Sequence, residues 1–308
     1  IRLLYRIKTL MRNLIFLITV IFLIGGLLPV GACNVPVFRY ALERWETDNY
    51  QILVYHNGTL SNEDKSIVDL LKQSSSANIP YSNYEVHTFD LEKKLEENIR
   101  NIWKFFGSPD RPYMVVFYPN SFWIRKPIWH GELTVNAVSS FIKSPVRQEI
   151  TKRILNGESS VFVLLESGNK EKDDEADKIL QNQLKNLEKS LKMPDILDNE
   201  FINDYVILNE KGPELHIAFS MIRVSRTDSA ESHFISMLMN SEPDLSEYIS
   251  YPIVFPIYGR GRILYSIVGD GINERNISEA CEFLVGPCSC IFKEQNPGVD
   301  LLTITDWN

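Results

Sequence analysis

The feature of this sequence that most constrains its fold is an internal similarity between two segments. Residues 36–58 align without a gap on residues 145–167, and Pro36 falls on Pro145. Each segment has an amphipathic stretch, a polar turn and a short β-branched run, and proline stands at the expected first helical position, where its missing N–H costs no hydrogen bond. One helix and one buried strand are therefore expected twice, which indicates a duplicated fold.

A second alignment relates two later segments. Residues 133–145 lie over residues 275–287, with Phe141 on Phe283. Two matches at corresponding ends of two units favour a repeated topology over chance similarity between amphipathic stretches. The chain of 308 residues is also long for one core and comfortable for two domains.

Domain boundaries follow from these alignments. We expect residues 1–32 to be a signal peptide, residues 33–143 to form domain 1 and residues 144–290 to form domain 2. Domain 2 contains an irregular insert at 193–213 with room for a further strand. Residues 291–308 form an apolar tail that we expect to pack on domain 2.

Both units have one predicted order of elements, which is helix, strand, helix, strand, helix, strand, strand, helix. The first unit has them at residues 36–46, 50–56, 62–73, 84–91, 92–105, 113–119, 127–133 and 134–143. After its first helix, the second unit has them at residues 160–166, 171–192, 215–224, 229–239, 252–269 (a hairpin) and 276–285. Ser61 is the expected N-cap of the helix that ends near Gln73.

This order resembles the thioredoxin fold. The closest similarity is local: "RPYMVVFYPN" (111–120) and "IWHGELTVNAVSSFI" (128–142) look like the proline, strand, strand and helix that end that fold. The resemblance implies an α/β class with two tandem thioredoxin-like domains. It also implies a cis-proline before the third strand of each domain, at Pro112 and at Pro252. A shared fold carries no function by itself.

Thioredoxin-like oxidoreductases carry Cys-x-x-Cys at the turn between the first strand and the next helix, where the helix N-terminus lowers the thiol pKa. In this chain the two corresponding turns read "HNGTLSNED" and "ESGNKEKDDE", and neither contains cysteine. We therefore expect both domains to lack the usual redox reaction of the family.

Three cysteines lie near the end of domain 2, at positions 281, 288 and 290. An exported compartment allows disulfides, so a structural disulfide among Cys281, Cys288 and Cys290, or inert thiols, is the first interpretation. A reducible Cys288–Cys290 pair is the second, because such a small ring is strained. Coordination of a soft metal by the three thiols is the third.

Two further patterns carry little chemical information. "GRGR" (259–262) suits a hairpin tip, with an anion site through Arg260 and Arg262 as the alternative. The acidic stretch 170–177 suits the start of a helix, because the helix dipole favours negative charge there, with a cation site as the alternative. The five histidines show no metal-ligand spacing.

The N-terminus has the pattern of an export signal. A basic stretch without acidic residues precedes an apolar run from Leu14 to Val30, and Met11 is a candidate true start. "LPVGAC" resembles a bacterial lipobox, which implies lipidation of Cys33 and anchoring by acyl chains. Cleavage after Ala32 without lipidation and an uncleaved anchor are the alternatives. We expect an exported protein, periplasmic or at the cell surface, that is anchored to the membrane.

The charge balance limits the partners. Residues 1–32 hold four basic residues and no acidic one, so the rest of the chain has 28 basic and 40 acidic residues, a net charge of −12 against −8 for the whole chain. A nucleic-acid partner is disfavoured, because phosphate binding needs a basic surface.

These observations favour a redox-inactive binding or scaffold module without a cofactor over an enzyme. The expected partner is a protein of the cell envelope. The alternative is a protein that handles thiols, disulfides or a soft metal through Cys281, Cys288 and Cys290. A hydrolase or transferase, whose site the sequence does not reveal, is the third hypothesis.

Overall fold

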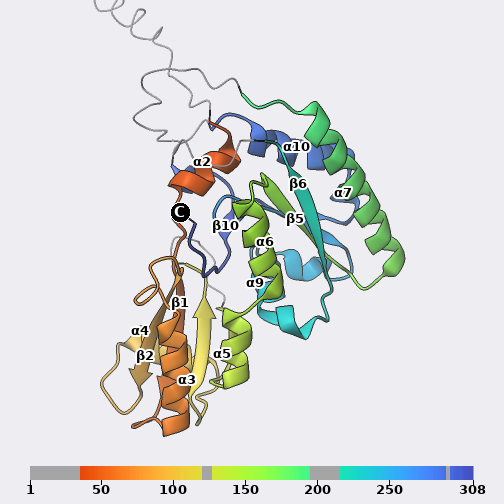
Figure 1. Ribbon diagram of the computed structural model, residues 1–308. Coiled ribbons are helices and arrows are strands. Elements are labelled where there is room, and N and C mark those ends of the chain that lie inside the picture. The colour runs from red at the N-terminus through yellow and green to blue at the C-terminus, as the bar shows by residue number, and fades with distance from the viewer. Residues whose placement is uncertain (1–34, 120–126, 195–215, 289–291, 308) are drawn as a thin grey trace, which may run out of the picture. The chain divides into compact units, whose positions relative to one another are not determined.

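Two β-sheets with helices on both faces make up most of the computed structural model (Figure 1). The structure describes residues 35–119, 127–194, 216–288 and 292–307. The expected mixed α/β class is confirmed. We call residues 50–142 the first module and residues 145–285 the second module.

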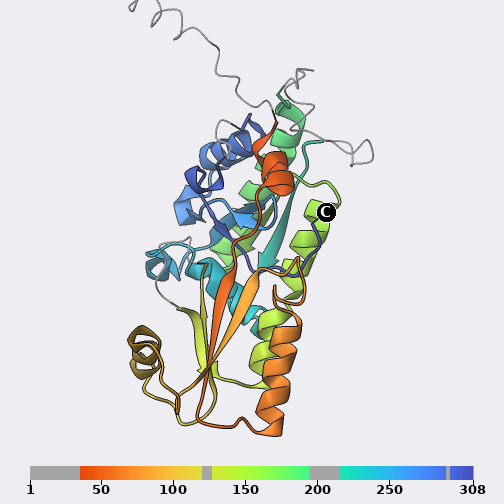
Figure 2. The same cartoon turned by 90° about the vertical axis from the view of Figure 1, so that its left-hand side faces the viewer.

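The first module contains one sheet of four strands with the order β2-β1-β3-β4. Its elements are β1 (Tyr50–His56), α3 (Asn62–Gln73), β2 (Tyr84–Asp90), α4 (Glu97–Phe105), β3 (Tyr113–Phe117), β4 (Pro127–Glu132) and α5 (Val135–Ile142). Strands β1 and β2 are parallel, while β3 is antiparallel to both β1 and β4. Helix α3 lies on one face of this sheet with α5, and α4 lies on the other (Figure 2).

The second module repeats this arrangement. Its elements are α6 (Pro145–Leu155), β5 (Ser160–Leu165), α7 (Lys170–Ser190), β6 (Phe219–Val224), α9 (Ser232–Met239), β7 (Ile253–Tyr258), β8 (Arg262–Ile263), β9 (Ile267–Val268) and α10 (Glu274–Val285). With β10 (Val299–Asp300) from the C-terminal tail, the sheet order is β10-β8-β7-β5-β6, and β9 also pairs with β7. Since β5 is parallel to β6 and β7 is antiparallel to β5 and β8, the two sheets share strand order and orientation.

The central strands explain why the sequence contains continuous apolar runs. In β5, Val161, Val163 and Leu165 belong to one buried cluster, and the alternating Phe162 and Leu164 belong to another. Strand β1 is likewise covered on both faces. A strand buried on both faces needs apolar side chains at every position, not at alternate ones.

Side-chain caps fix several helix starts. The Ser61 hydroxyl accepts a hydrogen bond from the Asp64 amide, which confirms the expected N-cap of α3. Thr134 caps α5 in the same way, and Asn169 caps α7. Each cap satisfies an amide that the first helical turn leaves without a partner.

Helix α2 (Val37–Arg44) precedes β1 in the chain but packs on the second module. The Val37 amide donates to the Gly286 carbonyl at 3.0 Å, and Phe38 and Trp45 share a buried cluster with Tyr258 and others. The sequence placed this helix in domain 1, as the counterpart of α6. Its amphipathic pattern specified a buried face but not the surface that covers it. Pro36 also stands before the helix, whereas Pro145 is its first residue in α6.

The C-terminal tail contacts both modules. Strand β10 (Val299–Asp300) extends the second sheet by pairing with β8. In the first module, the Asn83 side chain donates to the Leu301 carbonyl at 2.9 Å and accepts from the Thr303 amide at 2.6 Å. Trp307 is buried. The tail therefore joins the first module to the edge of the second sheet.

The predicted cis-prolines are wrong. Among the described residues there is no cis peptide bond, so both Pro112 and Pro252 follow trans bonds, the isomer that proline normally prefers. Each proline still directly precedes the third strand of its module.

Several predictions fall on residues outside the described ranges. These are the signal segment with Cys33, most of the insert 193–213, and Cys290. None of the helices within the described ranges combines the length and the apolar character that a membrane span requires.

Candidate functional site

The turns that follow β1 and β5 are closed by hydrogen bonds. After β5, Asp173 is only 3% exposed and accepts from the Ser167 amide (2.7 Å), the Ser167 hydroxyl (2.8 Å) and the Gly168 amide (3.0 Å). After β1, the Gly58 amide donates to Asp90 at 3.0 Å. Both turns lack cysteine, and in each a carboxylate accepts hydrogen bonds from backbone amides of the turn.

The two described cysteines are buried. Cys281 lies within α10 with a free thiol, so it forms no disulfide with Cys288. Burial raises the pKa of the Cys281 thiol, and Glu282 and Glu188 raise it further. Because the thiolate is the nucleophile, Cys281 is an inert thiol rather than a reactive one. The backbone amide of the buried Cys288 donates to the Val35 carbonyl at 2.9 Å.

The arginines of the 259–262 hairpin hold neighbouring segments. Arg260 donates to the Leu42 carbonyl at the end of α2, at 2.8 Å. Arg262 forms a buried ion pair with Asp300 of the tail at 3.0 Å. These contacts favour a structural role over an anion site. No group of three or more His, Cys, Asp or Glu side chains in the described ranges is arranged to hold a metal ion.

Each module has a cleft between the segment that precedes its third strand and the segment that precedes its last helix. In the first module, the Leu133 amide donates to the Pro112 carbonyl at 2.8 Å. In the second, the Gly269 amide donates to the Pro252 carbonyl at 2.9 Å. The two clefts therefore lie at corresponding places and share one backbone hydrogen bond.

The second cleft has a volume of about 520 Å³ and is lined by Glu242, Asp244, Leu245, Tyr248, Tyr251, Ser266, Val268, Gly269, Asp270 and Gly271. Helix η2 (Leu245–Tyr248) and the turn η3 (Gly269–Gly271) form its two sides. The buried Leu245 anchors η2 to the core. The cleft is thus built on rigid elements next to the central strands.

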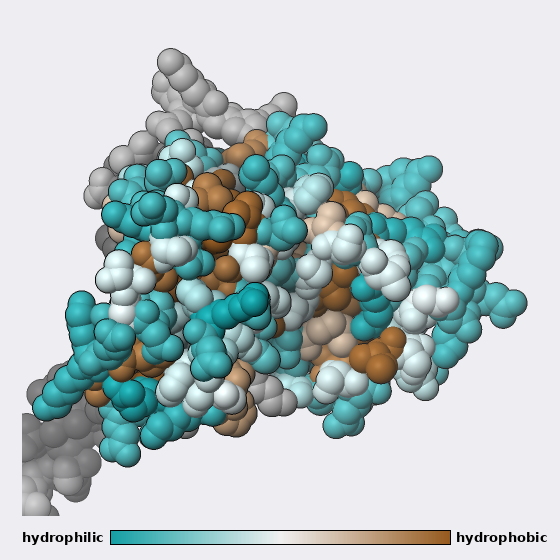
Figure 3. Space-filling view, turned by 90° about the horizontal axis from the view of Figure 1, so that it is seen from below, coloured by the Kyte–Doolittle hydropathy of each residue, from teal (hydrophilic) through white to brown (hydrophobic). Residues whose placement is uncertain are grey.

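Exposed aromatic side chains mark this cleft. On the face shown in Figure 3, hydrophobic residues form separate small patches between hydrophilic ones. Exposed apolar residues on this face therefore occur in local groups. Tyr248 is 37% exposed and Tyr251 39%, with ring centroids 6.5 Å apart, and Ile249 beside them is 60% exposed. Exposed large apolar side chains that gather at a cleft are typical of an interaction surface.

Tyr251 is held on three sides. Gly269 has φ +51°, and a Cβ there would lie 2.9 Å from the Tyr251 ring, so glycine is required both for the turn and for the contact. The Lys172 ammonium lies 4.5 Å from the centre of the ring. Arg226 donates to the Tyr251 carbonyl at 3.0 Å and to the Glu166 carbonyl at 2.7 Å. Gly269 and Lys172 therefore contact the Tyr251 ring, and Arg226 holds its backbone.

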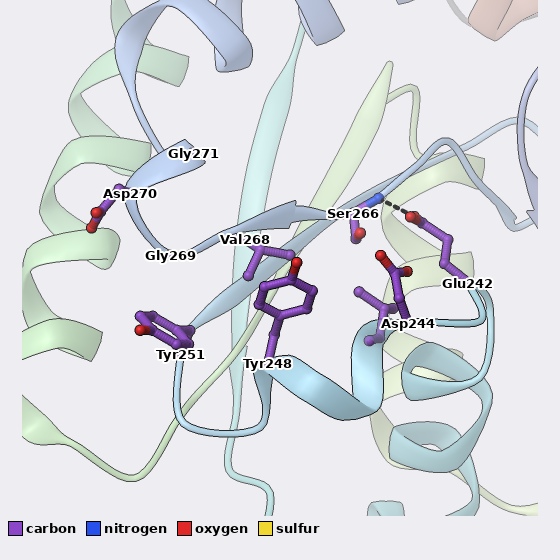
Figure 4. Close-up of a pocket in the computed structure, with 10 residues that line it drawn as sticks. Glu242, Asp244, Tyr248, Tyr251, Ser266, Val268, Gly269, Asp270 and Gly271 are labelled. Carbon is purple, nitrogen blue, oxygen red and sulfur yellow. Dashed lines mark hydrogen bonds between the residues drawn. The ribbon is translucent and has the colours of Figure 1, made fainter.

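Carboxylates lie beside the tyrosines. Glu242 accepts from the Ser266 amide at 2.6 Å. Within the described residues, the Asp244 and Asp270 carboxylates form no hydrogen bond or ion pair. Figure 4 shows Asp244 near Glu242, Tyr248 between Asp244 and Tyr251, and Asp270 pointing away from the tyrosines. The lining residues include no lysine or arginine, but Lys172 and Arg226 both contact Tyr251, which lines the cleft.

The first cleft differs in chemistry. Its volume is about 320 Å³, and its lining consists of Glu63, Asp64, Ile67, Arg111, Pro112, Glu132, Leu133, Thr134, Val135 and Asn136. Arg111 pairs with Glu132 at 3.3 Å, and Asp64 accepts from the Ser61 hydroxyl at 2.6 Å. This cleft has no aromatic side chain and contains its own cation.

The sequence located only part of this site. Pro112 and Pro252, which the sequence indicated, each lie at a cleft, whereas the two cysteines within the described residues, Cys281 and Cys288, lie in buried clusters. Tyr248, Tyr251 and Gly269 were missed, although "YISYP" beside Pro252 and "GDG" (269–271) were visible signals. No protein-family model matches this chain, and no curated protein does.

Proposed function

We propose that this chain is a redox-inactive pair of thioredoxin-like modules that binds a protein partner through its second cleft. The repeated strand order supports the thioredoxin-like assignment, because β2-β1-β3-β4 and β6-β5-β7-β8 have one pattern of parallel and antiparallel neighbours. The cleft carries the binding proposal, since it combines exposed aromatic rings with a rigid frame.

A redox role is disfavoured by the positions of the cysteines. The turns after β1 and β5 lack them, and the Cys281 thiol is buried with a raised pKa. The alternative function, which handles thiols or a soft metal, then depends on Cys288 and Cys290. Wild-type protein and a Cys288→Ser/Cys290→Ser double variant should both fail to reduce insulin disulfides. Reduction by the wild type that the double variant loses would restore the alternative.

The proposed location is outside the cytoplasm, on a membrane to which lipidated Cys33 anchors the protein. The support is the lipobox-like "LPVGAC". Cell fractionation of the wild type and Cys33→Ser should show the wild type with the membranes and the variant released. A variant that stays entirely with the membranes would contradict lipid anchoring at this residue.

Site-specific photo-crosslinking tests the binding surface. Benzoylphenylalanine at position 248 should yield a discrete cross-linked product in the producing cell, because this position lies in the second cleft. The same group at Phe105, which is exposed on the first module, is the matched control. Products that are absent at position 248, or identical at both positions, would contradict a partner at the cleft.

A further inference from the structure

The aromatic rings of the second cleft differ in what covers them. Lys172 lies against the Tyr251 ring, 4.5 Å from its centre. Tyr248 has no cation against its ring among the described residues, although it is the ring that lies beside Asp244 (Figure 4). A tyrosine face attracts an ammonium or guanidinium group, and the attraction increases where water is partly excluded. Tyr248 is therefore an available position for a ligand cation.

The charged residues that line the cleft also favour a cationic ligand. Glu242, Asp244 and Asp270 are among its lining residues, and these include no lysine or arginine, although Lys172 lies against the ring of Tyr251. Glu242 is engaged by the Ser266 amide. The whole chain carries a net charge of −8. An anionic segment would meet repulsion, whereas a cationic one would meet complementary charge, which favours encounter and specificity.

The apolar surface continues beyond the charged part. Ile249, the C-cap residue of η2, is 60% exposed and directly follows Tyr248 in the chain. Lysine and arginine carry apolar stems that can cover such a surface while their charged ends reach a carboxylate. An extended segment with cationic and apolar side chains matches both the negative charge of the cleft and its apolar surface, whereas a small inorganic cation matches only the charge.

We propose that the second cleft binds a lysine- or arginine-bearing peptide segment of a partner protein. The cation lies between the Tyr248 ring and the Asp244 carboxylate, and an apolar neighbour lies on Ile249. This inference rests on the proposed function of the cleft as a protein-binding surface, and it adds the chemistry of the partner.

The test is fluorescence polarisation with a labelled peptide, Gly-Lys-Leu-Lys-Leu-Gly, and a matched peptide in which glutamate replaces both lysines. Wild-type protein should bind the lysine peptide at least tenfold more tightly than the glutamate peptide. Asp244→Asn should weaken binding of the lysine peptide about tenfold, and so should Tyr248→Ala. Glu132→Gln in the first cleft is the matched control and should leave the affinity unchanged, and circular dichroism verifies that each variant folds.

The outcomes separate the two proposals. If Asp244→Asn and Glu132→Gln both leave binding unchanged, or if both peptides bind equally, the cationic partner is wrong. Should photo-crosslinking at position 248 still succeed in that case, the cleft remains a binding surface for a partner of other chemistry. When cross-linking at that position also fails, the proposed function is overturned together with the inference.

Discussion

The two modules share the order and orientation of four strands but have different connections into their third strands. Residues 106–112 join α4 to β3, whereas residues 240–252 join α9 to β7. The longer connection contains η2 and brings Asp244, Tyr248 and Tyr251 to the cleft. The corresponding first cleft keeps the backbone hydrogen bond at Pro112 but has only a solvent-exposed ion pair at its rim.

Under the proposed function, one scaffold would support a binding surface in one copy and not in the other. The strands and caps are duplicated, and the chemistry is carried by a loop that the scaffold tolerates at different lengths. Loops are the part of a fold in which insertions cost least and function concentrates. Matched substitutions in the two modules test this difference.

The largest effect is expected at the turn after β5. Asp173→Ala removes the acceptor of three hydrogen bonds inside the protein and should lower the free energy of unfolding by about 4 kcal/mol. Asp90→Ala, which removes the β2 acceptor of the Gly58 amide in the corresponding turn of the first module, should cost less, because the Asp90 side chain is 15% exposed. Urea denaturation measures both. Equal losses would contradict the difference between a buried turn and an open one.

The next effect concerns His233 of α9, which packs against two aromatic rings of the first module. Its ring centroid lies 5.2 Å from that of Trp129 and 5.8 Å from that of Phe141. Burial, with a smaller effect of Arg147, lowers the pKa of His233 from 6.5 to about 4. At pH values above 6.5 the residue is neutral in both states. Between pH 6.5 and 4 only the unfolded state takes up the proton, so the protein should lose on the order of 3 kcal/mol of stability.

The measurement compares the wild type with His233→Phe by urea denaturation from pH 7.5 to 4. Between pH 6.5 and 4 the wild type should lose on the order of 3 kcal/mol more of its free energy of unfolding than His233→Phe does. A profile of His233→Phe parallel to that of the wild type would show that His233 titrates normally.

A smaller effect is expected at the cleft glycines. Gly269→Ala combines a positive φ with a clash against Tyr251 and should cost about 2 kcal/mol. At the corresponding position the first module has Leu133, which has no positive φ. Gly271→Ala is the control, because its Cβ would meet only ordinary contacts at 3.6 and 3.7 Å, and it should change the stability by less than about 0.5 kcal/mol. Equal effects in thermal denaturation would contradict the assigned contact.

The smallest effect is expected in the first cleft. Arg111→Gln removes its cation and leaves Glu63, Asp64 and Glu132. Without aromatic rings the added negative character should change binding of the lysine peptide less than about threefold, since exposed ion pairs contribute little. A gain of tenfold or more would show that charge alone makes either cleft a binding surface.

Local sequence patterns predicted the repeated elements well and their packing less well. The strand at residues 50–56 and the cap at Ser61 were predictable, because apolar runs and hydroxyl caps act within a few residues. The position of α2 was not, because an amphipathic face does not specify its partner. The cleft was not predicted, because residues 244–251 and 269–271 are distant in the sequence and are brought together by the pairing of β7 with β9.

The most direct test of the second cleft is an exchange of charge between Asp244 and the peptide. Asp244→Lys should lose affinity for the lysine peptide at least tenfold and gain affinity for the glutamate peptide, because the local charge is reversed while the tyrosines remain. Fluorescence polarisation with both peptides and both proteins gives the four affinities. If Asp244→Lys still binds the lysine peptide more tightly than the glutamate peptide, as the wild type does, the second cleft is not the surface that discriminates partners by charge.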